Sequence, residues 1–202
     1  MVKRSIKGRL EVICGSMFSG KSDELIQRVR RAEFAGQKTT VFKHHVDTRM
    51  SMDCINSHNG NKHKAIALEK PEDIRLFLTE ETQVIAIDEV QFFSSAIIPV
   101  VLELIEEGKK VILAGLDLDF RGIPFGPIPG LLAVADSVKK LNAVCMTCGS
   151  DAHFSQRLIN GHAAKFDDPI VLIGAQDVYQ ARCRDCFIID RVAWLSSEQS
   201  FS

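Results

Sequence analysis

Apolar residues along the chain fall into two patterns, short continuous runs and residues that recur every three or four positions. The continuous runs predict buried strands, which cover 10–14, 38–44, 83–88 and 110–116. The periodic segments predict helices over 23–35 and 94–107, each followed by a glycine that can end a helix. Strands and helices that alternate in this order build a parallel sheet, because each crossover helix returns the chain to the same end of the sheet. The pattern therefore predicts an α/β fold with a mostly parallel sheet.

The segments between these elements have weaker patterns. We predict a short strand over 65–68, a helix over 71–78, a helical turn over 131–135 and a last core strand over 137–141. The polar stretch 45–64 has no period and is predicted to be a long loop. The stretch 117–130 is rich in proline and glycine, so we expect it to be irregular and, since it follows a sheet strand, to line a ligand pocket. Its candidate lining residues are Asp117, Phe120, Arg121 and Phe125, although the two phenylalanines could equally be loop anchors.

The composition is that of an ordinary globular protein. The chain has 202 residues, of which 46% are apolar and 25% charged, and its net charge is −1. This balance lacks the basic footprint of a nucleic-acid-binding protein and is more consistent with a small phosphorylated partner. No apolar run approaches the roughly 18 residues that cross a bilayer, and the apolar stretch after the basic N-terminal residues is too short for a signal peptide. We therefore expect a cytoplasmic protein with no membrane and no nucleic-acid partner.

A glycine-rich segment, GSMFSGKS, joins the first predicted strand to the first predicted helix. It has the spacing of a Walker A motif, whose glycines allow successive backbone N–H groups to face one phosphate. The residues that we expect to bind a nucleotide here are Gly15, Ser16, Met17, Phe18, Ser19, Gly20, Lys21 and Ser22. In such a loop the lysine reaches the β- and γ-phosphates and the serine hydroxyl ligates Mg²⁺. The alternative is a strand-to-helix turn with a surface lysine, but the flanking strand and helix favour the phosphate loop.

Two acidic residues end the predicted strand 83–88, as in a Walker B strand. Asp88, at the last strand position, is expected to hold Mg²⁺ directly or through water. Glu89, one residue further, can face the attacking oxygen as a general base. Arg49, in the polar loop, carries a guanidinium that can contact phosphate oxygens. A solvated pair of acids is the competing interpretation, and the upstream phosphate loop makes it the weaker one.

Four of the six cysteines form two C-x-x-C pairs, Cys145 with Cys148 and Cys183 with Cys186. Two such pairs complete a tetrahedral Cys₄ site, which predicts a structural Zn²⁺; a redox dithiol pair or free thiols are the alternatives. The chain between the pairs, which includes a predicted strand over 169–173, would be tied at both ends and could act as a lid. The predicted domains are 1–142 for nucleotide binding, 143–192 for zinc, and 193–202 as a loose tail.

With these segments identified, the sequence resembles the thymidine kinases of the smaller, zinc-containing class, which are related to RecA-like P-loop folds. The signatures that carry the resemblance follow one another over about residues 10–186: GSMFSGKS, DTR, DEVQFF, GLDLDFRGIPFG, and C-x-x-C with Y-x-x-x-C-x-x-C. The resemblance implies a RecA-like P-loop domain with a mostly parallel sheet, together with a small Cys₄ zinc-ribbon domain that carries a lasso loop.

The resemblance also implies an activity, the transfer of the ATP γ-phosphate to the 5′-hydroxyl of thymidine to give dTMP and ADP. It implies Glu89 as the base and Phe120 as the residue that stacks on thymine. The remaining implied contacts are Lys21, Ser22, Asp88 and Gln91 for Mg²⁺ and nucleotide, and Leu172, Gly174 and Tyr179 in the lasso. Members of this class are typically homotetramers inhibited by dTTP, so both properties are expected here.

The sequence departs from the family pattern at three positions. Asn59 follows His58 where relatives have aspartate, Ala175 replaces a second glycine, and Ser155 stands where threonine is also seen. These changes concern nucleoside preference rather than the class of reaction.

Two other functions compete with the kinase. One is a nucleic-acid-stimulated P-loop ATPase with a DNA-binding zinc ribbon, and the other is a GTPase-like switch, which would need an N-K-x-D motif that this sequence lacks.

Overall fold

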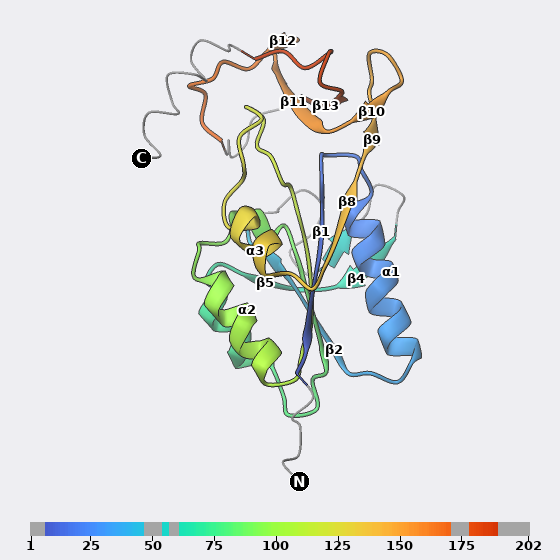
Figure 1. The fold of residues 1–202 in the computed structure, drawn as a ribbon, viewed down its shortest axis with the longest axis vertical. Coiled ribbons are helices and arrows are strands. Elements are labelled where there is room, and N and C mark those ends of the chain that lie inside the picture. Colours follow the sequence, from blue (N-terminus) through green and yellow to red (C-terminus); the bar gives the residue numbers. More distant parts are fainter. Residues whose placement is uncertain (1–6, 47–53, 57–60, 171–177, 190–202) are drawn as a thin grey trace. The chain divides into compact units, whose positions relative to one another are not determined.

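The computed structural model describes residues 7–46, 54–56, 61–170 and 178–189 (Figure 1). The chain divides into two compact units. The first contains Met1–Cys14, Gly20–Asp117 and Phe125–Leu141, and the second contains Gly15–Ser19, Leu118–Pro124 and Asn142–Ser202. Two short segments that are distant in sequence from residue 142 therefore pack with the C-terminal part of the chain. The predicted tail 193–202 lies outside the described residues, and the predicted domain limits stay a prediction.

A six-stranded sheet forms the centre of the first unit. Its order is β5 (Ile66–Leu68), β2 (Thr39–His44), β6 (Val84–Asp88), β7 (Lys110–Gly115), β1 (Arg9–Gly15) and β8 (Ser137–Leu141). The pairs β5–β2, β2–β6, β6–β7 and β7–β1 are all parallel. The predicted α/β fold with a mostly parallel sheet is confirmed. Because the strands are parallel, β6 ends in Asp88 at the same edge of the sheet where β2 ends.

Helices cover both faces of this sheet (Figure 1). Helix α1 (Lys21–Phe34) buries Leu25, Ile26 and Val29 against one face. Helices α2 (Ile97–Glu106) and α3 (Ile128–Val134) bury their apolar residues against the other face. Each fully buried aliphatic side chain stabilises such a core by about 1.5–3 kcal/mol, so the two clusters contribute most of the stability of the sheet.

Two predicted segments between residues 45 and 78 differ in the structure. The helix predicted over 71–78 is a short 3₁₀ helix, η1 (Pro71–Phe77). Its buried residues are Pro71 and Ile74, three positions apart, which matches the three-residue turn of a 3₁₀ helix. The predicted loop 45–64 contains a hairpin of β3 (Cys54–Asn56) and β4 (Lys62–Lys64). Ile55 of this hairpin is 2% exposed and joins the core under α1, an anchor that a single apolar residue in a polar stretch does not reveal.

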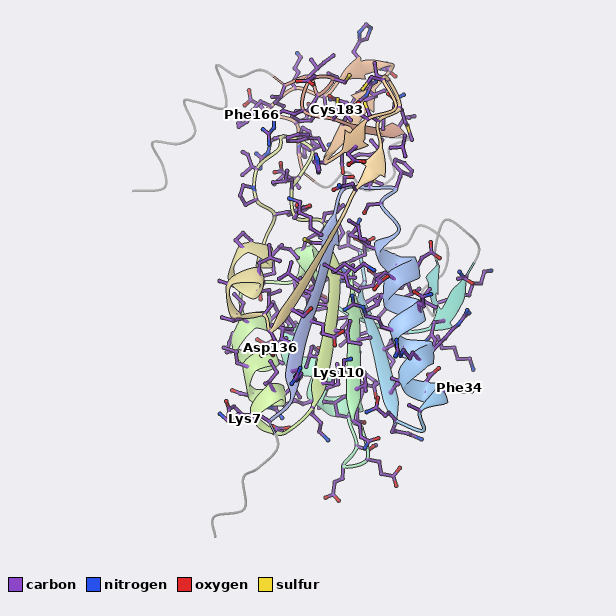
Figure 2. The ribbon with its side chains drawn as sticks, turned by 45° about the vertical axis from the view of Figure 1, so that its right-hand side comes forward. Lys7, Phe34, Lys110, Asp136, Phe166 and Cys183 are labelled. Atoms are coloured by element: carbon purple, nitrogen blue, oxygen red, sulfur yellow. The ribbon has the colours of Figure 1, made fainter. Side chains whose placement is uncertain are left out.

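Strand β8 was predicted in the core but lies at the edge of the sheet, with four of its five residues exposed. Asp136 fixes where this strand begins (Figure 2). Its carboxylate accepts a hydrogen bond from the Leu10 backbone N–H at 2.8 Å, and its own backbone N–H donates to the Leu10 carbonyl. These contacts hold β8 beside β1 without the apolar burial of a core strand.

The second unit contains small antiparallel sheets. One pairs β9 (Ala143–Val144) with β10 (Asp151–Ala152), and the other has the order β12 (His162–Ala163), β11 (Phe154–Ile159), β13 (Val178–Arg182). The predicted strand 169–173 is absent at residues 169 and 170, and 171–173 lie outside the described residues. Within the described part of the chain, every helix is too short or too polar to span a membrane.

Candidate functional site

The glycine-rich segment adopts the backbone that a phosphate-binding loop needs. Gly20 is the N-cap of α1 and has φ of 83°, a left-handed conformation that favours glycine. The N-cap residue makes no side-chain hydrogen bond to the start of α1, and the first backbone N–H groups of a helix have no acceptor within the helix itself. The positive end of the helix dipole lies at the same point. Lys21 and Ser22 are the first two residues of this helix.

Ser22 and Asp88 lie in contact, as expected for two groups that share one cation. The Ser22 hydroxyl donates to the Asp88 carboxylate at 2.8 Å, and Asp88 also accepts from the Glu89 backbone N–H at 2.9 Å. Burial raises the pKa of Asp88 to about 7, and the charge of Glu89 adds to this rise. Hard oxygen ligands from a hydroxyl and a carboxylate suit Mg²⁺. The donor set therefore fits the predicted Mg²⁺ with a bound nucleotide.

Glu89 is held in place by its neighbours. Its φ is 52°, a left-handed value that is uncommon for a residue with a side chain and persists only where the surrounding structure fixes it. Its carboxylate accepts a hydrogen bond from the Gln91 side-chain amide. The oxygen of the same amide accepts from the Leu116 backbone N–H at 3.0 Å, and Gln91 is 2% exposed. The amide therefore connects Glu89 to the end of β7.

Two glycines make room for Gln91. A Cβ on Gly115 would lie 2.6 Å from the Gln91 side-chain oxygen, and one on Gly126 would lie 2.2 Å from the Gln91 backbone oxygen. Both distances are shorter than van der Waals contact allows. Gly115 and Gly126, two of the three glycines in the GLDLDFRGIPFG signature, therefore have a local explanation, which is the close approach of Gln91.

The stretch 117–130, predicted to be irregular, is divided between the two units, and its last three residues form the start of α3. Phe125 packs edge-on against Phe92 in the first unit, with ring centroids 5.6 Å apart, and acts as a loop anchor. Asp117, 7% exposed, forms an ion pair with Lys140 at 2.7 Å in that same unit. Phe120 belongs to the second unit and is 4% exposed.

Residues 118–124 form a tight turn around one carboxylate. Asp119 accepts hydrogen bonds from the backbone N–H groups of Arg121 and Ile123 and from the Arg121 guanidinium. The Arg121 guanidinium also lies 5.3 Å from the centroid of the Phe166 ring. This internal network fixes the backbone on which Phe120 is presented.

A fully buried arginine faces Phe120 in the second unit. The Arg157 guanidinium lies 5.3 Å from the centroid of the Phe120 ring, and it donates to the Pro169 carbonyl at 2.6 Å. Tyr179, predicted in the lasso, lies on β13 directly opposite Arg157. Sequence reasoning did not single out Arg157 because a lone arginine in a strand carries no motif.

Three residues that were predicted at the site, Arg49, Leu172 and Gly174, lie outside the described residues.

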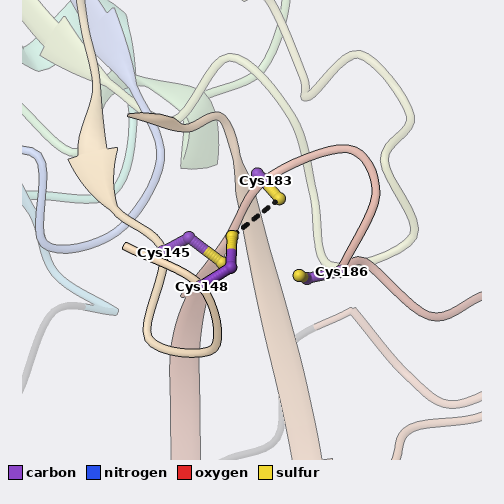
Figure 3. A group of neighbouring side chains, drawn as sticks. All are labelled: Cys145, Cys148, Cys183 and Cys186. Atoms are coloured by element: carbon purple, nitrogen blue, oxygen red, sulfur yellow. Dashed lines mark hydrogen bonds between the residues drawn. The ribbon is translucent and has the colours of Figure 1, made fainter. Parts of the chain in front are cut away.

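The four cysteines of the two C-x-x-C pairs converge in the second unit (Figure 3). Their sulfur atoms all lie within 4.8 Å of one another, and those of Cys148 and Cys183 are 3.6 Å apart. A disulfide would need about 2.05 Å, whereas four thiolates around one Zn²⁺ lie about 3.8 Å apart. The arrangement therefore fits a tetrahedral Zn²⁺ site.

The thiols of the cluster differ in acidity, and hydrogen bonding with the Cys183 thiol is the main cause that raises the pKa of Cys186 to about 12. Burial opposes ionisation of Cys145, but hydrogen bonds from the backbone N–H groups of residues 147, 148 and 183 lower its pKa to about 6. Such donors stabilise the thiolate that binds a metal. Cys14 is different, because burial raises its pKa to about 11 and it lies in β1 as an inert packing residue.

A family model described as thymidine kinase matches residues 8–187, which includes the phosphate loop, the acidic residues Asp88 and Glu89, and all four clustered cysteines. The match extends from the first strand of the sheet to the second C-x-x-C pair. The chain therefore belongs to the thymidine kinase family and is an ATP-dependent nucleoside kinase.

Proposed function

We propose that this chain transfers the γ-phosphoryl group of Mg²⁺-bound ATP to the 5′-hydroxyl of thymidine, giving dTMP and ADP. The observation that carries this proposal is the contact between Ser22 of the phosphate loop and Asp88, with Glu89 adjacent to it, in a chain of this family. Phosphoryl transfer requires mainly positioning and charge neutralisation. A phosphate loop, a cation site and one carboxylate supply both.

In this mechanism the Glu89 carboxylate accepts the proton of the thymidine 5′-hydroxyl while its oxygen bonds to the γ-phosphorus. The bond from that phosphorus to the bridging oxygen breaks, and ADP leaves with the electron pair. Lys21 and the backbone N–H groups of residues 15–22 stabilise the charge on the phosphates, with Arg49 as a further contact. Ser22 and Asp88 would hold Mg²⁺, which neutralises charge on the β- and γ-phosphates when bound. Gln91 keeps the carboxylate of Glu89 oriented.

For the nucleoside, we propose that Phe120 stacks on thymine and that the lasso with Leu172, Gly174 and Tyr179 recognises the base through main-chain hydrogen bonds. Zn²⁺ bound by Cys145, Cys148, Cys183 and Cys186 has a structural role, because a Cys₄ site leaves no open position for chemistry.

We also propose that the active form is a homotetramer and that dTTP, the end product of the same salvage route, inhibits it.

The proposed reaction is tested with the full-length protein, Mg²⁺ and ATP. ADP release should depend on thymidine, and the product should be dTMP. Single-stranded DNA in place of thymidine should give only the background rate. Release that depends on DNA and not on thymidine would overturn the proposal and favour the nucleic-acid-stimulated ATPase. Deoxyuridine and thymidine compared in the same assay measure how much the C5 methyl group contributes.

Replacing Gly115 with alanine should displace Gln91 and thereby Glu89. We expect kcat to fall about 10- to 100-fold, because small displacements of a catalytic group are costly, and the free energy of unfolding to fall by about 1–3 kcal/mol from overpacking. Gly130→Ala is the control, since its added methyl group meets only the movable end of the Ile98 side chain. Steady-state kinetics and thermal unfolding of both variants check this. Unchanged kcat in Gly115→Ala would show that Gln91 does not orient the base.

A further inference from the structure

Strand β11 presents buried polar side chains to the phosphate loop. Side chains alternate along a strand, so Ser155 and Arg157 lie on one face and Phe154 and Gln156 on the other. The Ser155 hydroxyl accepts a hydrogen bond from the Met17 backbone N–H at 2.9 Å, across 138 positions of sequence. Ser155 is 3% exposed, so water does not compete effectively for this contact.

A second contact joins the same two segments. The Ser16 hydroxyl donates to the Ala152 carbonyl at the end of β10, at 3.3 Å, and Ser16 is also 3% exposed. Both contacts lie within the second unit, which contains Gly15–Ser19. The first half of the phosphate loop is therefore attached to the cysteine-bearing part of the chain, and not only to the sheet strand that precedes it.

The other face of β11 is attached to the second cysteine pair. Gln156 accepts a hydrogen bond from the Ile188 backbone N–H at 2.8 Å, and the Phe154 ring stacks on Phe187 with centroids 4.5 Å apart. Phe187 in turn donates its backbone N–H to the Cys183 carbonyl. One strand thus contacts the phosphate loop on one face and the metal-binding turn on the other.

Part of the phosphate loop has a backbone conformation of high energy, so contacts from other segments are needed to hold it. Phe18 has φ of 64°, in the left-handed region where a side chain is disfavoured, and it directly follows Met17. Such a conformation persists only where the surroundings fix it. A hydrogen bond that immobilises the Met17 peptide reduces the ordering that ATP would otherwise have to impose.

We propose that Ser155 is a positioning residue for ATP, whose hydroxyl fixes the phosphate-binding loop through the Met17 N–H and so connects the Cys₄ module to nucleotide affinity. The proposal rests on ATP binding at this loop, as set out above. Arg157, two positions along the same face, contacts Phe120 and the Pro169 carbonyl instead. Its effect should therefore fall on the nucleoside, which gives a matched comparison on one strand.

The test compares Ser155→Thr with Ser155→Val, which have the same shape and differ in the hydroxyl. Calorimetry with a non-hydrolysable ATP analogue and Mg²⁺, without nucleoside, measures nucleotide affinity directly. We expect the threonine variant to bind close to wild type and the valine variant to bind about tenfold more weakly, because the half-buried Met17 N–H loses its partner. In steady-state assays KM for ATP should rise by a similar factor, with a smaller change in KM for thymidine. Ser137→Ala, at an exposed serine of β8, is the control.

Equal affinity of the threonine and valine variants for the analogue would overturn the proposal. So would equal increases of both KM values, since a general structural defect affects both substrates alike. Zinc content per chain and thermal unfolding show whether each variant is folded, and Ser155→Ala against wild type decides by the same criterion if the valine variant does not fold. If wild type binds the analogue but shows no thymidine-dependent ADP release, the proposed reaction fails while the binding comparison still decides the role of Ser155.

Discussion

Replacing Glu89 with glutamine is expected to lower kcat by about 10²- to 10⁴-fold, the usual contribution of a general base. The affinity for Mg²⁺-bound ATP should change little, because the amide keeps the size of the carboxylate and the phosphate contacts come from the loop 15–22. Glutamine cannot accept the proton of the attacking hydroxyl at neutral pH. Single-turnover measurements of dTMP formation separate this loss from product release.

Two comparisons sharpen this prediction. Glu89→Asp keeps the carboxylate but retracts it by one methylene group, so its kcat should lie between those of wild type and Glu89→Gln. Glu80→Gln removes an exposed carboxylate before β6 and should leave kcat unchanged. If Glu89→Gln keeps the wild-type kcat, another group takes the proton, and the left-handed backbone of Glu89 needs a different explanation.

Much of the molecule was predictable because its signals are local. The buried strands, α1 and α2 follow from apolar spacing, and the cysteine cluster follows from two C-x-x-C pairs. The structure brings Ser22 and Asp88 together because the parallel sheet ends both segments at one edge. The Walker A spacing and the predicted order of parallel strands were therefore enough to predict that Ser22 and Asp88 lie close together.

The supporting contacts were not predictable because they join segments that are distant in sequence and carry no motif. The Met17–Ser155 hydrogen bond and the position of Arg157 against Phe120 depend on how an irregular turn meets a short strand. Gln91 belongs to a recognisable signature, yet its link to Leu116 requires the register of β6 and β7. The hairpin β3–β4 was missed because Ile55, which is buried, has no periodic partner in the polar stretch around it.

Loss of the metal from the four cysteines is expected to disorder the second unit while the first stays folded. Among the described residues, the buried apolar cluster around the cysteines consists of small side chains, namely Ala143, Cys145, Ala152, Ala181 and Cys183. A core of this size supplies little stability, whereas structural Zn²⁺ contributes about 10–16 kcal/mol in small domains. Cys183→Ser, or prolonged chelation, should therefore remove amide protection from β11 and β13 in hydrogen-exchange measurements. Protection of β6 and β7 should remain, since their side chains lie in the large cores.

The kinetic consequence of metal loss should extend to both substrates. Phe120 and Tyr179 belong to the disordered unit, so we expect KM for thymidine to rise at least 100-fold, the typical result of losing an interface anchor. KM for ATP should also rise, but only about tenfold, because Ser16 and Met17 lose their contacts with β10 and β11 while Lys21 and Ser22 stay on α1. Cys54→Ser, at a half-buried cysteine outside the cluster, is the control. Unchanged KM for ATP after complete metal loss would mean that the phosphate loop keeps its conformation without the second unit, and that the sheet alone organises it.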